Sequence, residues 1–449
     1  MNRITIAAIC AFLLLENCAS AETVIGNVRL VTMTDQGVVD GRALVIDDGV
    51  IVEVIPEEDA AARKGDYIDG KGGYLTPGLI DAHVHHYDAV PQINYVANGV
   101  TTVIGLGQRD SAEAFLELRR AALAKEVVAP RVYTTYMTIA NHIEIEDLAE
   151  ARAYVRKMKS DGYDLVKVYN NISKPVFDAV ADEAERNGLS VFGHLPRNFP
   201  VEYSLSHGLD VVAHAEEFYF AYFGGPRDQE LAGFDGSNIP DYSKMQKAID
   251  LMAKHDVALI PNIVFSFVTM RFWDDEGAAM ADPELAYWPQ EAIDAWRQTN
   301  GARRDQVDKR MLRDRIKYNA IHELTRRAHD AGVLIVTGTD APVRGVIPGL
   351  SVHSEMRELI KSGLSFEEAL AAATKNGGEL IAKYVDEDAR VGMIAFGYEA
   401  DLILVSDNPL DDIRNMRKIE GVMLDGRWLD RATLDAMREG VVSRVADAE

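Results

Sequence analysis

Two histidines placed two positions apart are the residues of this sequence best suited to do chemistry. His83 and His85 follow the apolar run 76–82. On a β-strand, alternate side chains share one face, so both imidazoles would lie on the same side and could bind one metal ion. A Pro-Gly turn inside the run and the Gly-Val-Thr-Thr-Val segment at 99–103 favour a buried strand end over a half-exposed strand carrying two unrelated polar residues.

Four further potential ligands lie within two residues of the end of other apolar runs. They are Lys167, His194, His214 and Asp340. Taken singly, a histidine here would more often be structural, and an aspartate could simply cap the next helix. Taken together, they predict one site, because the carboxyl ends of parallel strands meet at the same mouth of a barrel.

Lys167 is the unusual member of this group. It lies within the short apolar run 165–169, and a buried strand is an unfavourable place for an ammonium ion. One interpretation is a salt bridge to a carboxylate at the same mouth. The other is chemical modification of the amine into a carboxylate-like bridge between metal ions.

Eight short apolar runs, most of them separated by helical patterns, are expected to position these residues. The runs span 78–85, 101–106, 131–139, 165–169, 190–194, 211–214, 258–265 and 333–340, and helical patterns occupy 111–125, 146–161, 174–187 and 242–254. This alternation predicts an α/β fold, a (β/α)8 TIM barrel. A doubly wound sheet is the alternative, but no glycine-rich phosphate loop follows any of the runs.

Both ends of the mature chain have short alternating strands that are too few to bury a face alone. We therefore expect them to pair into one small β-sandwich domain beside the barrel. The predicted organisation is a signal peptide at 1–21, β-sandwich segments at 22–75 and 386–435, a barrel at 76–385 and a polar tail at 436–449.

One long connection interrupts the barrel pattern. Residues 266–332 are rich in charge and contain Trp273, Trp288 and Trp296. A connection that leaves the carboxyl end of a barrel strand lies over the mouth, where substrates enter. We interpret it as a helical insertion that serves either as a lid or as a subunit contact, so a homo-oligomer is one possibility.

Composition excludes several classes of partner. The 449 residues are 47% hydrophobic, which is enough for one large barrel with a satellite domain. The 47 Lys and Arg against 71 Asp and Glu give a net charge of −24. No basic run stands out, so nucleic acids and anionic membrane surfaces are poor partners.

The first residues have the pattern of an export signal. Arg3 precedes the apolar run 4–15, and Ala-Ser-Ala at 19–21 matches a small-residue cleavage site. The run is too short to span a bilayer. Cleavage after Ala21 predicts a periplasmic or secreted protein.

Cleavage would also remove both cysteines, Cys10 and Cys18, so no thiolate would be left as a ligand or nucleophile. The alternative is a lipidated Cys18, which would attach the protein to a membrane.

These motifs together resemble the metal-dependent amidohydrolase superfamily, in the branch of imidazolonepropionase-like proteins and Xaa-Pro (prolidase-like) or Xaa-Arg/Lys dipeptidases. The resemblance covers nearly the whole mature chain. The residues that carry it are Pro77-Gly-Leu-Ile-Asp-Ala-His-Val-His85, Gly99-Val-Thr-Thr-Val103, Asp164-Leu-Val-Lys-Val-Tyr169, His194, His214, Gly338-Thr-Asp340 and Gly397-Tyr-Glu-Ala-Asp-Leu402.

The resemblance implies a binuclear site, usually of zinc. His83, His85 and Asp340 would hold one divalent ion, and His194 and His214 would hold the second.

Lys167, as N6-carboxylysine, would bridge the two ions. A hydroxide shared by the ions would attack the scissile carbonyl, and Asp340 would act as the catalytic residue by moving its proton to the leaving amine. Carboxylation would also remove the cost of burying the Lys167 ammonium.

The sequence departs from the dipeptidase pattern beside the site, at Gly105-Leu-Gly-Gln108 and at Glu216-Glu-Phe-Tyr-Phe220. These changes leave the expected ligands intact but bear on the substrate pocket. Candidate substrate-binding residues after the strands are His142, Tyr169, Arg197, Tyr219 and Arg344.

The leading function is therefore an exported hydrolase that cleaves an amide C–N bond in a small molecule such as a dipeptide or an N-acyl amino acid. An ester, lactone or cyclic-amide hydrolase of the same superfamily is the alternative. A non-catalytic barrel scaffold would be expected to lose ligands. A metal carrier would need flexible exposed ligands rather than ligands fixed at strand ends.

Overall fold

The computed structural model describes residues 22–86, 92–107, 113–225, 227, 230–231, 234–236, 240–301, 307–343 and 345–447. The predicted signal peptide and the substrate-binding candidate Arg344 therefore lie outside the described residues.

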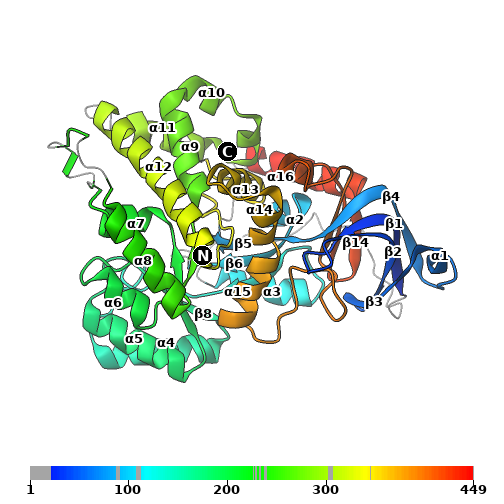
Figure 1. The fold of residues 1–449 in the computed structure, drawn as a ribbon, viewed down its shortest axis with the longest axis horizontal. Coiled ribbons are helices and arrows are strands. Elements are labelled where there is room, and N and C mark those ends of the chain that lie inside the picture. Colours follow the sequence, from blue (N-terminus) through cyan, green and yellow to red (C-terminus); the bar gives the residue numbers. More distant parts are fainter. Residues whose placement is uncertain are drawn as a thin grey trace, which may run out of the picture.

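Two parallel sheets form the centre of the molecule (Figure 1). One has the order β5-β6-β7 and the other β11-β10-β9-β8. Their strands are β5 (Leu79–Val84), β6 (Val100–Gly105), β7 (Arg131–Thr134), β8 (Leu165–Val168), β9 (Ser190–Gly193), β10 (Val211–Ala213) and β11 (Ala258–Ile260). An α/β architecture with parallel strands, as the alternating pattern predicted, is confirmed.

Backbone hydrogen bonds join the two sheets on both sides. On one side, the Asp164 N–H donates to the Thr134 carbonyl. The Ile139 N–H donates to the Lys167 carbonyl of β8, and the Ile139 carbonyl accepts from the N–H of Tyr169, just after β8. On the other, the segment 334–341 bonds to β11 through Leu259 and to β5 through the His83 carbonyl, which accepts from the Asp340 N–H at 2.7 Å. The predicted eighth strand is thus an irregular segment of single bridges between β11 and β5.

Helices follow most of the parallel strands and cover their outer side (Figure 1). They are α2 (Ile93–Ala97), α3 (Ala114–Leu123), α4 (Leu148–Asp161), α5 (Lys174–Arg186), α6 (Val201–Ser206), α7 (Glu216–Ala221), α8 (Tyr242–His255), α13 (Ser351–Lys361), α14 (Phe366–Ala372) and α15 (Lys375–Tyr384). Helix α4 has a clear signal at each end: the Asp147 carboxylate caps its start, and Gly162 ends it in a left-handed conformation.

Strands from both ends of the chain meet in a seven-stranded sheet of order β14-β13-β12-β4-β1-β2-β3. These are β1 (Thr23–Val31), β2 (Val38–Asp47), β3 (Val50–Pro56), β4 (Asp66–Pro77), β12 (Leu402–Val405), β13 (Ile419–Leu424) and β14 (Arg427–Asp430), with the short helices α1 (Glu57–Ala60) and η4 (Ile413–Arg417) beside them. β12 pairs antiparallel with β4, so residues more than three hundred positions apart hold this sheet together. Figure 1 shows it at one end of the molecule, away from α4–α8.

The predicted seventh strand, 258–265, is wrong in its second half. β11 ends at Ile260, Asn262 has a φ of 52°, and helix α9 (Ile263–Asp274) begins directly after it. The apolar residues at 263–265 belong to this helix. Short apolar segments such as those on either side of Pro261 and Asn262 do not distinguish a buried strand from the start of a buried helix. The third predicted strand, 131–139, is likewise shorter, because β7 ends at Thr134.

The insertion between the seventh and eighth strand segments is helical. Its elements after α9 are α10 (Glu276–Met280), η2 (Pro283–Tyr287), α11 (Gln290–Gly301) and α12 (Val307–Asp330). Trp288 and Trp296 are buried in an apolar cluster with Phe272 and Ile347.

The chain end predicted as a polar tail is instead the helix α16 (Arg431–Asp447). Val441 and Val445 lie on one side of it, four residues apart, and are buried in the same apolar cluster as the insertion's tryptophans. These two buried valines give the helix an apolar face, which explains why 436–447 is not a free tail.

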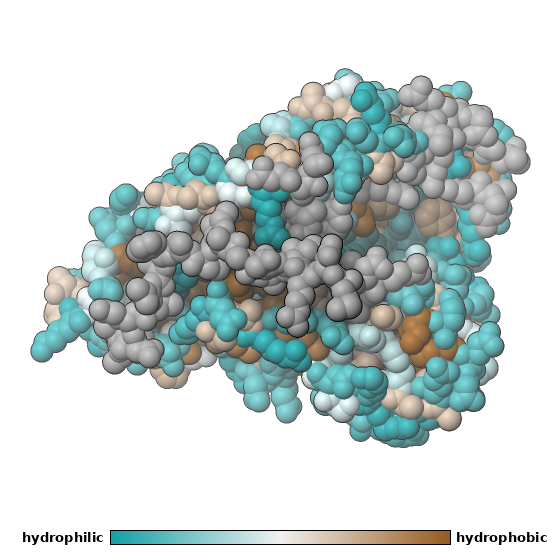
Figure 2. All heavy atoms as spheres, turned by 180° about the vertical axis from the view of Figure 1, so that it is seen from behind, coloured by the Kyte–Doolittle hydropathy of each residue, from teal (hydrophilic) through white to brown (hydrophobic). Residues whose placement is uncertain are grey.

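Among the described residues, no helix combines the length and apolar character needed to cross a membrane. On the face drawn in Figure 2, hydrophilic residues cover most of the described surface and hydrophobic ones lie in scattered groups.

Candidate metal centre

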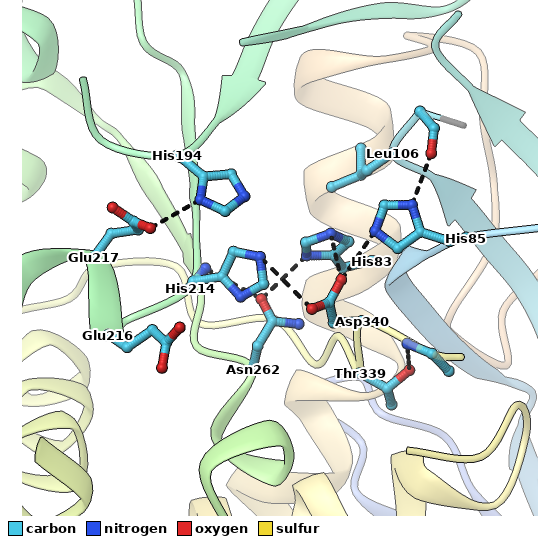
Figure 3. A network of polar contacts seen from close by, with 12 residues as sticks. His83, His85, Leu106, His194, His214, Glu216, Glu217, Asn262, Thr339 and Asp340 are labelled. Atoms are coloured by element: carbon cyan, nitrogen blue, oxygen red, sulfur yellow. Dashed lines mark hydrogen bonds and ion pairs between the residues drawn. The ribbon is translucent and has the colours of Figure 1, made fainter. Parts of the chain in front are cut away.

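Three side chains predicted as ligands of one ion lie together at the carboxyl end of β5 (Figure 3). The Oδ1 atom of Asp340 lies 2.9 Å from Nε2 of His85 and 3.3 Å from Nε2 of His83. The candidate ligand atoms of the three residues all lie within 4.8 Å of one another. One cation could therefore be bound by all three without a large rearrangement.

The two remaining histidines continue this cluster. The ring of His214 lies 4.7 Å from that of His83, and the ring of His194 lies 4.5 Å from that of His214. Nε2 of His214 is 4.0 Å from Oδ2 of Asp340. The four histidine rings thus form a continuous row across the mouth, with Asp340 beside its middle (Figure 3).

Three of these rings are held by hydrogen bonds at Nδ1, which leaves Nε2 as the potential ligand atom. Nδ1 of His83 donates to Asn262 Oδ1 at 3.2 Å, that of His85 to the Gly107 carbonyl at 2.7 Å, and that of His194 to Glu217 Oε1 at 2.9 Å. A metal-bound histidine usually donates its second N–H to such an acceptor, which fixes both the tautomer and the ring orientation.

Burial keeps the imidazoles of His83, His194 and His214 neutral, as a metal ligand must be. Desolvation lowers the pKa of His214 to about 3, with a further contribution from His194. Desolvation, followed by the charge of Lys167, also lowers the pKa values of His83 and His194 well below the usual value. Neutral rings with a free Nε2 lone pair suit zinc, which prefers nitrogen donors.

Lys167 lies on β8 among these groups and is only 2% exposed. Its Nζ atom has no hydrogen-bond partner among the described residues. Burial lowers the pKa of its ammonium to about 7, although the Asp340 and Glu217 carboxylates act in the opposite direction. An unpartnered buried amine is costly, so Lys167 fits a site where a further group completes its interactions.

A second carboxylate, that of Asp81, holds the backbone beside Asp340 through Thr339. Asp81, which is fully buried, accepts from the Thr339 backbone N–H at 2.9 Å and from the Thr339 hydroxyl at 2.6 Å. Burial alone would raise the pKa of Asp340, but the neighbouring histidines and Lys167 hold it below its usual value.

Both His214 and Asp340 adopt left-handed backbone conformations, with φ of 71° and 67°. Such conformations are rare for residues other than glycine and are found where the surrounding structure enforces them. They turn the two side chains toward the mouth at the points where their strand segments end.

The candidate substrate-binding residues differ in their placement. The Tyr169 ring lies 4.2 Å from the ring of His194, beside the cluster. Tyr219 is buried, and its hydroxyl has no hydrogen-bond partner among the described residues. His142 accepts a hydrogen bond from the Thr138 backbone N–H at 3.4 Å, inside its own loop.

Arg197 contacts a carboxylate that sequence reasoning did not identify as part of the site. Its Nε and Nη2 atoms donate to Oε2 of Glu217 at 3.1 and 2.8 Å. The same carboxylate accepts from His194, so Glu217 links the arginine to a candidate ligand. The only sequence signal for Glu217 was its place in segment 216–220, where this sequence differs from the dipeptidase pattern.

Replacing Glu217 by alanine is expected to lower the free energy of unfolding by about 3 kcal/mol, because it leaves the mostly buried Arg197 guanidinium without its carboxylate. Urea unfolding of the metal-free protein measures this. Asp161→Ala, which breaks the exposed pair with Lys157, is the control and should change stability little. Equal stability of the Glu217 variant and the wild type would contradict a structural role for the pair.

A second ion pair attaches the insertion to the same region. Lys317 of α12 is 5% exposed, and its Nζ lies 2.5 Å from Oε2 of Glu216, two residues after His214. The Phe220 ring also lies 5.4 Å from the Lys317 Nζ. Helix α12 therefore packs against α7, the helix that follows β10.

Comparison with known proteins agrees with this geometry. The model of the amidohydrolase family matches residues 316–429. An imidazolonepropionase of Chromobacterium violaceum is 33% identical over 153 residues, which cover 28% of this chain and 37% of the relative. An imidazolonepropionase of Salmonella heidelberg is 39% identical over 69 residues, 14% of this chain and 17% of the relative. The chain thus matches well under half the length of these curated relatives.

Solved structures match over most of the chain. Bottromycin amidohydrolase has a TM-score of 0.71 at 22% identity, covering 94% of this chain and 90% of the other. A prolidase-type protein from Bifidobacterium longum has a TM-score of 0.69 at 23% identity, with 94% and 100% covered. A Xaa-Pro dipeptidase with bound methionine has a TM-score of 0.67 at 21% identity, with 91% and 100% covered. The resemblance to the amidohydrolase superfamily is confirmed over residues 316–429, which match the family model. Imidazolonepropionases are homologous over part of the chain, and the chain shares the fold of Xaa-Pro dipeptidase-like amidohydrolases.

Proposed function

We propose that this protein is a metal-dependent hydrolase that cleaves an amide C–N bond in a small molecule such as a dipeptide or an N-acyl amino acid. The observation that carries the proposal is the convergence of His83, His85 and Asp340 within 4.8 Å, with two more histidine rings in contact. Homology to imidazolonepropionases and the shared fold with a Xaa-Pro dipeptidase and bottromycin amidohydrolase support this reaction class.

The same proposal includes a closed (β/α)8 barrel. Support comes from the backbone hydrogen bonds that join the two parallel sheets at Ile139 and at 334–341. The seven-stranded sheet would form the small β-sandwich domain built from both chain ends.

The donor set fits two divalent ions, most suitably zinc. His83, His85 and Asp340 would hold the first ion, and His194 and His214 the second. When bound, the two ions would acidify a water molecule and polarise the scissile carbonyl.

Lys167 would bridge the two ions as N6-carboxylysine. Addition of carbon dioxide to the neutral amine forms the N–C bond and releases one proton, giving an anion in place of a buried cation. The burial of Lys167 and its unpartnered Nζ support this assignment.

Asp340 is positioned to move the proton. Its Oδ2 atom faces the row of histidines while Oδ1 contacts His83 and His85. We propose that this carboxylate takes the proton from the attacking water and delivers it to the leaving amine. The same arrangement could act on an ester, a lactone or a cyclic amide, because the Asp340 carboxylate can protonate a leaving oxygen as well as a leaving nitrogen.

Metal analysis together with a substrate panel tests this function. The purified protein is expected to contain about two divalent ions per chain and to hydrolyse members of a library of dipeptides and N-acyl amino acids at neutral pH with added zinc. Chelation should abolish the activity, and zinc should restore it. Full activity in a metal-free preparation would refute the proposal, and turnover of esters or lactones alone would favour the second candidate.

We further propose that the protein is exported, which the pattern of residues 1–21 supports. Expression of the full chain in a bacterium should give a periplasmic or secreted product that begins at Glu22, as read by N-terminal sequencing. A product that begins at a lipid-modified Cys18 would support the lipoprotein alternative. An intact Met1 in the cytoplasm would contradict both.

A further inference from the structure

Asn262 lies between the two groups of candidate ligands and contacts both. It follows β11, is 3% exposed, and its Oδ1 atom accepts from Nδ1 of His83 at 3.2 Å and from the backbone N–H of His214 at 3.1 Å. Figure 3 shows this oxygen directed toward the space between His83 and His214. One amide oxygen therefore links a candidate ligand of the first ion to a candidate ligand of the second.

The position of Asn262 is itself fixed on both sides. Its backbone is left-handed, with φ of 52° and ψ of 43°, a conformation that asparagine tolerates better than most residues. The next two backbone N–H groups, of Ile263 and Val264, donate to the buried Glu355 carboxylate at 3.0 and 2.6 Å. This carboxylate at the start of α9 leaves the asparagine little freedom to move.

The backbone beside His214 is held by the same segment. Its N–H also donates to the Ile260 carbonyl at 2.9 Å, and the Ala215 N–H donates to the Pro261 carbonyl at 3.0 Å. His214 needs such support because its φ is 71°. Residues 260–262 therefore hold His214 by the backbone, while the Asn262 side chain additionally holds His83 by its ring.

We propose that Asn262 is a positioning residue shared by the two metal sites, which sets the ring orientation of His83 and the backbone of His214 at once. The inference rests on the proposed binuclear function and extends it. Its consequence is that loss of the Asn262 oxygen weakens the binding of both ions, although the residue itself binds neither. Loss of an outer hydrogen-bond partner of a metal ligand typically lowers metal affinity by about 10- to 100-fold.

The test distinguishes the effect of the Asn262 side-chain oxygen on zinc binding from the effect of its left-handed backbone conformation. Asn262→Gly keeps the left-handed conformation but lacks the acceptor, whereas Asn262→Asp keeps both. Asn262→Ala also lacks the acceptor and replaces the glycine variant should that variant fail to fold. Zinc chloride alone is titrated into each full-length metal-free protein, and the affinity of both equivalents is measured by competition with a chromogenic chelator.

We expect Asn262→Gly to bind both zinc equivalents about 10- to 100-fold more weakly than the wild type and Asn262→Asp to bind them within about tenfold of it. Asn94→Ala removes another buried asparagine, whose Nδ2 donates to the Pro348 carbonyl and not to a candidate ligand, and should leave zinc affinity unchanged. Circular dichroism checks that each variant is folded.

Three results would overturn the inference. They are wild-type zinc affinity in the glycine variant, equal weakening in the glycine and aspartate variants, and weakening of one equivalent only. A wild-type protein that takes up no zinc would instead overturn the proposed function, and the inference with it. The two failures are thus distinguishable by the wild-type titration.

Discussion

Asp340→Asn is expected to lower turnover by about 10²- to 10⁴-fold while the protein keeps most of its metal. The asparagine oxygen can still lie near His83 and His85, where the carboxylate Oδ1 is found at 3.3 and 2.9 Å. The amide cannot accept and release a proton near neutral pH, so only the proton transfer is lost. Steady-state kinetics with metal analysis of the same samples measures both quantities.

A matched control for this variant exists in the chain. Asp256 also has a left-handed backbone, with φ of 61° against 67° for Asp340, but its side chain is 71% exposed. Asp256→Asn should leave turnover and metal content unchanged. If Asp340→Asn loses its metal in proportion to its activity, the carboxylate acts as a ligand only and the proposed proton transfer is wrong.

The placement of the candidate ligands could be anticipated because it depends on local periodicity and parallel topology. Lys167 shares its face of β8 with Leu165, two residues earlier, and pairs in register with Phe192 of β9. His194 follows the end of β9 directly. Alternation along each strand and the common direction of the strands were enough to bring such residues to one rim.

The positioning residues could not be anticipated in the same way. Asn262 was included in a predicted strand because apolar residues flank it on both sides in 258–265, whereas Pro261 and the left-handed Asn262 separate β11 from α9. The pairing of Glu217 with Arg197 crosses from one strand connection to the next, 20 residues apart, and depends on tertiary packing. The periodic spacing of apolar residues along the sequence carries no information about such pairs.

The insertion and the last helix show the same limit. The insertion was expected to be helical, but the packing of its element η2 against α16 was not expected. Val441 and Val445 are too few to indicate by themselves where their helix packs, and their partners Trp288 and Trp296 lie far away in sequence. Long-range apolar contacts of this type require the fold before they can be assigned.

Lys167→Ala is expected to lower activity by about 10²-fold or more, and short-chain carboxylic acids such as acetate or propionate should restore part of it. Lys167 is 2% exposed and its Nζ has no partner among the described residues, so alanine leaves a small space beside the histidines rather than an unpaired charge. A small carboxylate that enters this space supplies the anion that N6-carboxylysine would have provided.

The control is a second buried lysine with a different role. Lys317 is 5% exposed and is paired with Glu216, so any activity that Lys317→Ala loses should not be restored by carboxylic acids, because its loss removes a cation rather than an anion. A crystal structure of the metal-loaded wild type should show a planar three-atom extension on the Lys167 nitrogen. An unmodified amine on Lys167, or equal rescue of both variants by carboxylic acids, would refute the bridging carbamate. Lys167 would then be an ammonium ion whose charge the Asp340 carboxylate has to balance.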